Sequence, residues 1–235
     1  MTETYEFKRL KAIFEGDGSD IREQFIFAGL LLTIFERFTK YVVEQVDGFF
    51  SNHFNIIDGK LQYTRGEKFN KLIKEKGGHL PGQHANKEFR ATLHWFYDLD
   101  AITEYELNSI ERIYTLRNDI GHETFHIIAD DNKHPIKLDD VLITFSVYLK
   151  IVRWWVKEVE ATTDPDFDQG KYDSTNWDEV ESIDTVFLRE IILKSLVGDA
   201  DREAWHSMLR RAALSQQLLL CARFEKSGRT RANRW

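Results

Sequence analysis

Cysteine is almost absent from this chain of 235 residues, and Cys221 is the only one. A single thiol cannot form an intramolecular disulfide, and zinc sites built from several thiolates are excluded. Such a composition is typical of proteins in a reducing compartment. Residues 1–6 also lack the basic and then apolar pattern of a signal peptide, so we expect a cytoplasmic protein.

Long apolar runs and a positive net charge are missing as well. The most apolar stretch, residues 25–35, is bracketed closely by Glu23 and Glu36, so a buried helix is expected there and not a membrane span. The formal charge is −7, which excludes a general polyanion-binding surface and leaves only local contacts with nucleic acid. Residues 223–235 are basic, and we interpret them as a solvated terminus.

Prolines are few, and Pro81, Pro135 and Pro165 all lie in stretches that resemble connections between elements. Between them, apolar residues recur at spacings of three and four, which is the pattern of amphipathic helices. The chain is therefore predicted to be all-α, with one short extended segment at residues 61–63. The expected helices span residues 21–50, 67–76, 85–99, 103–128, 138–159, 183–197 and 201–220.

Residues 162–181 interrupt this pattern, because seven acidic residues and one lysine surround Pro165 and Gly170. Such a composition indicates a linker or a long surface loop. The predicted organisation is a helical bundle at residues 1–161, an acidic linker or surface loop at 162–181, a C-terminal helical extension at 182–220 and a basic tail at 221–235.

The helix expected at residues 103–128 carries the one constellation with a plausible chemistry. Thr103 and Glu106 form a capping box at its start. One face of this helix advances by alternating steps of three and four residues, and it comprises Leu107, Ile110, Tyr114, Arg117 and Gly121. Arg117 thus lies where a core residue is expected, so its guanidinium needs a partner, a cleft or an interface.

Asn118 and His122, four residues apart, occupy the neighbouring row of the same helix. With Arg117 they could present a permanent cation, an amide and an imidazole to one side. Arginine binds phosphate oxygens bidentately and can stabilise a developing phosphorane. Histidine titrates near neutrality and can move protons in a transesterification. Neither a metal nor another cofactor is required.

Arg117, Asn118 and His122 resemble the motif of the HEPN superfamily. Its ribonuclease members are small helical bundles with an arginine, a polar residue directly after it, and a histidine after four to six intervening residues. The resemblance covers residues 21–159. It implies a HEPN-like antiparallel bundle that dimerises with its site at the interface and cuts RNA without metal by attack of the 2′-hydroxyl.

The same resemblance implies that Arg117 is the phosphate clamp, His122 the general acid and base, and Asn118 a positioning residue. Many proteins of this superfamily are toxins or antiviral-defence effectors, so an inhibitory partner protein is a further expectation. The region after residue 162 has no counterpart in the family pattern.

A second function stays open, that of a non-catalytic helical interaction module which binds RNA, a nucleotide or a partner protein. In that case Arg117 makes a buried ion pair, to Asp119 or Glu123 of another chain or to a distant carboxylate, and His122 caps or packs. The two functions differ in whether Arg117 and His122 converge at an open cleft or are sealed in a core.

Three further features are weaker candidates. His126, one turn after His122, is either a second site residue or a surface histidine. His94 and Asp98 lack further ligands at defined spacing, so packing is favoured over a metal site. Trp154 and Trp155 point to two sides of their helix, so one ring is expected in the core and the other against the extension, a partner or an RNA base.

Overall fold

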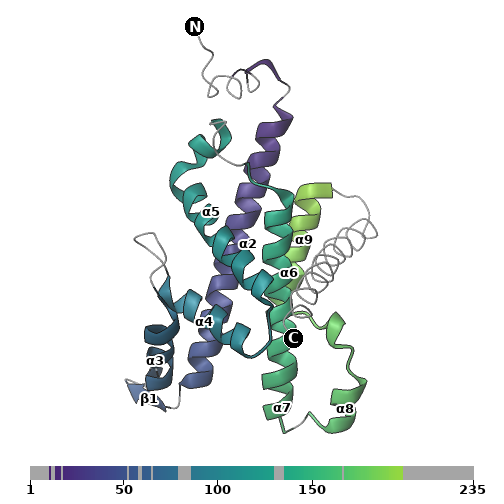
Figure 1. The fold of residues 1–235 in the computed structure, drawn as a ribbon. Helices are drawn as coiled ribbons and strands as arrows, with labels where there is room; N and C mark the ends of the chain where they lie inside the picture. The colour runs from purple at the N-terminus through teal and green to yellow at the C-terminus, as the bar shows by residue number, and fades with distance from the viewer. Residues whose placement is uncertain are drawn as a thin grey trace, which may run out of the picture. The chain divides into compact units, whose positions relative to one another are not determined.

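The predicted all-α class is confirmed in the part of the chain that is described, where one two-stranded hairpin is the only exception to helices (Figure 1). The chain divides into two compact units, residues 1–188 and 189–235. The predicted helix at 201–220 and the basic tail at 221–235 lie outside the described residues. The computed structural model describes residues 11, 14–16, 18–51, 53–57, 60–64, 66–78, 86–129, 135–165 and 167–197.

The observed helices follow the predicted ranges to within a few residues at most ends. Two of them, α3 and α9, begin and end at the predicted residues. The helices are α2 (Ser19–Phe50), α3 (Glu67–Lys76), α4 (Lys87–Asp98), α5 (Glu104–Ala129), α6 (Leu138–Trp155), α7 (Ala161–Thr163), α8 (Gln169–Ser174) and α9 (Ile183–Val197), with a π-helical turn η1 (Val156–Glu160) and a 3-10 turn η2 (Trp177–Glu179).

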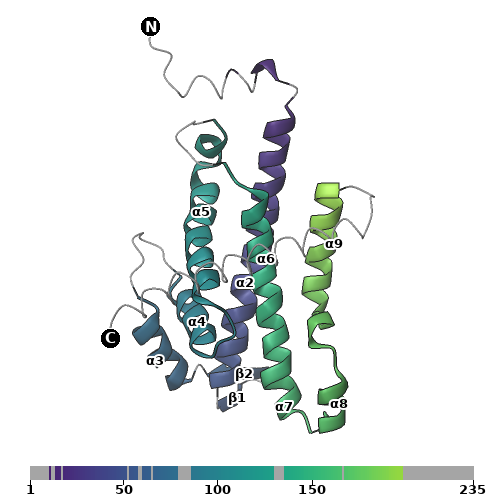
Figure 2. The same ribbon diagram turned by 45° about the vertical axis from the view of Figure 1, so that its right-hand side comes forward.

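The long helix α2 forms the centre of the first unit and contacts α3, α4, α5 and α6. Figure 2 shows α5 and α6 running beside it. Its apolar face is buried through Leu31, Ile34, Phe38, Val42 and Val46, at the predicted spacings. Each such side chain contributes roughly 1.5–3 kcal/mol by leaving water. None of the described helices combines the length and apolar character that crossing a membrane requires.

A β-hairpin connects α2 to α3. Strand β1 (His53–Ile57) pairs antiparallel with β2 (Lys60–Thr64), in a register that places His53 opposite Thr64 and Ile57 opposite Lys60. The extended segment predicted at residues 61–63 therefore belongs to β2. Its partner strand had been assigned to a loop.

The junction between α4 and α5 fixes where α5 begins. At the end of α4 the Asp100 N–H donates to the Tyr97 carbonyl at 3.1 Å and the Ala101 N–H to the Phe96 carbonyl at 2.9 Å, which is the Schellman pattern. Asp100 takes the left-handed position of this motif, with φ of 56°. The predicted capping box follows directly: the Thr103 N–H donates to Glu106 Oε2 at 2.6 Å and the Glu106 N–H to Thr103 Oγ1 at 3.3 Å.

The acidic segment at residues 162–181 is structured. It contains α8 and η2, and the rings of Phe167 and Tyr172 both contact Trp177. The Arg153 Nε–H donates to the Val180 carbonyl at 3.0 Å, which ties the end of this segment to α6. The segment belongs to the first compact unit, and the division between the two units falls within α9.

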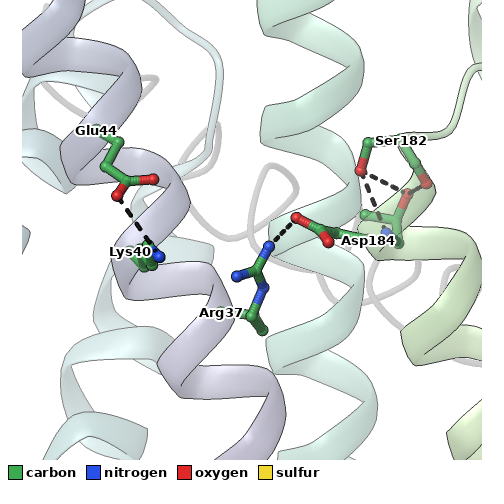
Figure 3. Close-up of polar contacts among 6 residues, drawn as sticks. Arg37, Lys40, Glu44, Ser182 and Asp184 are labelled. Carbon is green, nitrogen blue, oxygen red and sulfur yellow. Dashed lines mark hydrogen bonds and ion pairs between the residues drawn. The ribbon is translucent and has the colours of Figure 1, made fainter.

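Just after this segment, α9 begins with a contact to α2. Figure 3 shows Arg37 of α2 pointing at Asp184, with which it forms an ion pair. Ser182 caps the helix, because its Oγ accepts from the Thr185 N–H at 3.2 Å. Arg37 and Arg153 together therefore hold residues 180–184 against the bundle.

Candidate functional site

The buried side of α5 is a row of isoleucines. Ile110, Ile113, Ile120 and Ile127 are each at most 2% exposed. Because α5 contacts α2, α4 and α6, these side chains anchor the helix in the bundle. The row determines which residues of α5 face outward.

The predicted apolar face of α5 leaves the core partway along the helix, and this corrects our interpretation of Arg117 as a core position. Ile110 is buried, Tyr114 and Arg117 are half-buried, and Gly121 is exposed. The Tyr114 hydroxyl accepts from the backbone N–H of Asn86, the N-cap of α4, at 2.8 Å. Tyr114 therefore lies level with the start of α4, and Arg117 lies one turn beyond it.

Among the described residues, Arg117 has a hydrogen bond to a neighbouring amide and no ion pair with a carboxylate. Its Nη1 donates to Asn118 Oδ1 at 3.2 Å, and within the described part of the chain no carboxylate lies within ion-pair distance of it. Asn118 is half-buried and His122 is exposed. Arg117 and Asn118 are thus joined by a hydrogen bond, and none of the three residues is sealed in the core.

A kink follows His122 immediately. Glu123 has φ of −132° and ψ of 30°, outside the helical range. Two neighbours weaken the helix at this point: Gly121 has low helix propensity, and the Thr124 hydroxyl donates to the Ile120 carbonyl. His122 is therefore the last residue before the helix changes direction. His126 lies beyond the kink, and its side chain is outside the described residues.

Arg117, Asn118 and His122 lie outside the groove that is found among the described residues of this region. A groove of about 760 Å³ lies between α5 and the start of α6, on the neighbouring side of α5. Arg112, Thr115 and Asp119 of α5 line it, whereas Arg117, Asn118 and His122 do not. The three predicted site residues are therefore beside this groove and not in it, and of the three His122 is exposed.

A second polar cluster joins α4 to α5, and sequence reasoning missed it. Glu111 Oε1 accepts from Arg90 Nε at 3.0 Å and lies 3.2 Å from His94 Nε2. Arg90 and His94 are four residues apart on α4, which was the available signal. The backbone at Gly78 also packs closely against the Arg90 guanidinium. These contacts make the cluster a connection between helices.

The weaker sequence candidates receive structural roles. His94 pairs with Glu111, while Asp98 pairs with Lys76. Among the described residues no group of three or more His, Cys, Asp or Glu side chains could hold a metal ion. Trp155 is buried, as expected for one ring of the pair, and Trp154 is half-buried. Both rings contact Trp95.

Comparison with protein-family models, with curated proteins and with solved structures gives no match to this chain. The case for a function therefore rests on the side chains of α5 and their surroundings.

Proposed function

We propose that this chain is a metal-independent endoribonuclease of the HEPN type. Arg117 holds the scissile phosphate, Asn118 positions the guanidinium and His122 transfers protons. The observation that carries the proposal is the state of Arg117, which is half-buried, hydrogen-bonded to Asn118 and without a carboxylate partner in the described part of the chain. An arginine that only holds the fold is expected in an ion pair, as Arg37, Arg90 and Arg112 are.

The chemistry needs no group beyond these side chains. The ribose 2′-hydroxyl attacks the adjacent phosphorus while an imidazole takes its proton. The guanidinium stabilises the additional negative charge on the phosphorane, since it can donate two parallel N–H bonds to the phosphate oxygens. The bond from phosphorus to the 5′-oxygen then breaks, and the leaving oxygen receives a proton. The products carry a 2′,3′-cyclic phosphate and a 5′-hydroxyl.

The open surface around His122 favours a two-fold dimer as the active form. In an in-line displacement the attacking and leaving oxygens are on opposite sides of phosphorus, so a single imidazole cannot readily serve both. A second copy related by a two-fold axis supplies the other histidine and a second surface against which the RNA can lie. Light scattering at micromolar concentration is expected to give about twice the chain mass of 27.7 kDa.

The test uses a short RNA and a matched RNA with a 2′-deoxy residue at the cleavage site, each incubated with the full chain in excess chelator. We expect cleavage of the first, with a cyclic phosphate on the product, and no cleavage of the second at that site. Efficient cutting of the deoxy substrate, or complete loss of activity in chelator, would show that the proposal is wrong. Expression in cells, followed by growth and total RNA, tests the toxin or defence role.

A second candidate is a non-catalytic helical interaction module that binds RNA, a nucleotide or a partner protein, including an inhibitory one. It is favoured by the absence of Arg117, Asn118 and His122 from the groove of the described chain. Such a module binds RNA without cutting it, and binding weakens in Arg117→Ala while His122→Ala changes little. Cleavage by the dimer separates the two candidates.

A further inference from the structure

The groove between α5 and α6 has the size of a small-molecule site. Its volume of about 760 Å³ lies within the roughly 300–1,000 Å³ typical of ligand pockets. Its apolar surface comes from Leu116 and Ile143, both half-buried, and from the buried Ile127. Flat apolar rings can pack on such a surface.

The polar groups of the groove favour hydrogen-bond donors over anions. Asp119 is half-buried and Asp139 exposed, and neither has a hydrogen bond or ion pair within the described part of the chain. Asp140, in contrast, is engaged on both oxygens: Oδ1 accepts from Arg112 Nη2 at 2.7 Å and Oδ2 from the Lys137 N–H at 3.2 Å. Three carboxylates therefore face two cations, Arg112 and Lys137, so a phosphate is a poor occupant.

The groove begins within one helical turn of the proposed site. Asp119 precedes His122 by three residues, and Thr115 precedes Asn118 by three. Residues at this spacing have Cβ atoms about 5–6 Å apart on a helix. An RNA whose phosphate lies at Arg117 and His122 can therefore place a neighbouring base in the groove.

We infer that this groove binds a guanine base next to the scissile phosphate, an inference that rests on the proposed function. Guanine presents the N1–H and N2–H donors side by side, which suits the two oxygens of Asp119, and its O6 and N7 accept from an arginine such as Arg112. Adenine, cytosine and uracil do not offer two adjacent donors on that edge. Single-stranded RNA exposes this edge for such contacts.

The test measures binding of nucleotides to the full chain by titration calorimetry. Guanosine 5′-monophosphate is the probe, and inosine 5′-monophosphate differs from it only by the missing N2 amine. We expect inosine monophosphate to bind about tenfold more weakly, because it loses one of the two donors to Asp119. Asp119→Asn is expected to weaken guanosine monophosphate by a similar factor, since an amide offers one acceptor oxygen in place of two.

Glu36→Gln is the matched control, because Glu36 is exposed on α2, outside the groove. It is expected to bind guanosine monophosphate as the wild type does. If Asp119→Asn fails to fold, the two nucleotides compared on the wild-type chain decide the question alone. The inference is overturned if guanosine, inosine and adenosine monophosphates bind alike, if none of them binds, or if a folded Asp119→Asn binds like the wild type.

Failure of this inference and failure of the proposed function have different signatures. A chain that cuts no RNA but binds guanosine monophosphate through Asp119 has the base site and lacks the ribonuclease activity. A chain that cuts RNA equally after every base and shows no selectivity among the nucleotides is a ribonuclease without the base site.

Discussion

The first and second halves of α5 use their polar side chains in different ways. In the first half, Glu106 closes the capping box and pairs with Lys150 of α6, and Glu111 accepts from Arg90 of α4. In the second half, Arg117 has Asn118 as its hydrogen-bond partner and His122 is exposed. The helix is the same, but Glu106 and Glu111 of the first half contact neighbouring helices, whereas Arg117 of the second half bonds to its own neighbour Asn118.

This difference separates stability from function along one element. A charged group that bridges two helices is costly to remove, because its partner is left without a counter-charge. A charged group on an open surface can be replaced at little cost in stability. Substitutions in the two halves are therefore expected to affect different measurements.

The largest expected effect is a loss of cleavage activity, without unfolding, when residues in the second half of α5 are substituted. His122→Ala is expected to lower the cleavage rate about 10²- to 10⁴-fold, because it removes the general acid and base. Arg117→Lys is expected to be nearly inactive as well, since an ammonium cannot reproduce the planar fork of a guanidinium. Single-turnover cleavage gives the rates and thermal unfolding gives the stability.

Asn108→Ala and Arg22→Lys are the matched controls, because both residues are exposed and lie outside the proposed site. They are expected to keep wild-type rates. If Arg117→Lys unfolds while His122→Ala is stable and fully active, Arg117 is a structural residue and the comparison between the two halves is wrong.

The next largest expected effect is a loss of stability when Glu106, in the first half of α5, is substituted. Glu106 is buried, and its carboxylate accepts from the Thr103 N–H and from Lys150 Nζ at 2.8 Å. Glu106→Ala removes the cap and leaves Lys150 unpaired, so we expect a loss of about 2 kcal/mol in the free energy of unfolding. Urea denaturation measures it. Cleavage well below the unfolding midpoint is expected to be unchanged, and a lost activity in folded protein would contradict the division of roles.

Sequence reasoning recovered the elements whose signals are local. The capping box of Thr103 and Glu106 was predicted and is confirmed. The helix Glu67–Lys76 was predicted with its ends, since Gly77 follows it directly. Strand β1 was missed although Asp58 and Gly59, a residue pair typical of hairpin turns, separate the two strands in the sequence. If Asp58 and Gly59 had been interpreted as a turn, the hairpin would have been predicted.

The position of Arg117 could not be predicted in the same way. Periodicity places it on the face of Ile110 and Tyr114, but how long that face stays buried depends on where α4 begins. That point is fixed by the contact between Asn86 and Tyr114, which are 28 positions apart in the chain. The groove beside Asp119 likewise requires α6 to lie against α5. A single sequence carries no signal for the contact between Asn86 and Tyr114 or for the packing of α6 against α5.

A smaller effect on stability is expected from substitutions at Asp100, in the turn that precedes α5. Asp100 has φ of 56°, a left-handed conformation that glycine adopts without strain. Asp100→Gly is therefore expected to stabilise the chain by about 0.5–1 kcal/mol, and Asp100→Ala to destabilise it by a similar amount. Urea denaturation of both variants measures the difference. Equal stability of the two would show that the Schellman motif does not limit the start of α5.

The smallest effect concerns the hydroxyl group of Tyr148 in α6, which lies in the core. Its ring is fully buried and its hydroxyl makes no hydrogen bond in the described chain. Burial raises the pKa of Tyr148 to about 12, so the folded chain keeps a proton that the unfolded chain loses near pH 10. The free energy of unfolding therefore falls as the pH rises from about 10 to about 12.

At pH 7, Tyr148→Phe is expected to change stability by less than about 0.5 kcal/mol, because it removes a hydroxyl that has no hydrogen-bond partner among the described residues. Between pH 10 and 12 the variant is expected to lose less stability than the wild type, which urea denaturation at several pH values measures, and a loss above 2 kcal/mol at pH 7 would mean that the hydroxyl is hydrogen-bonded after all.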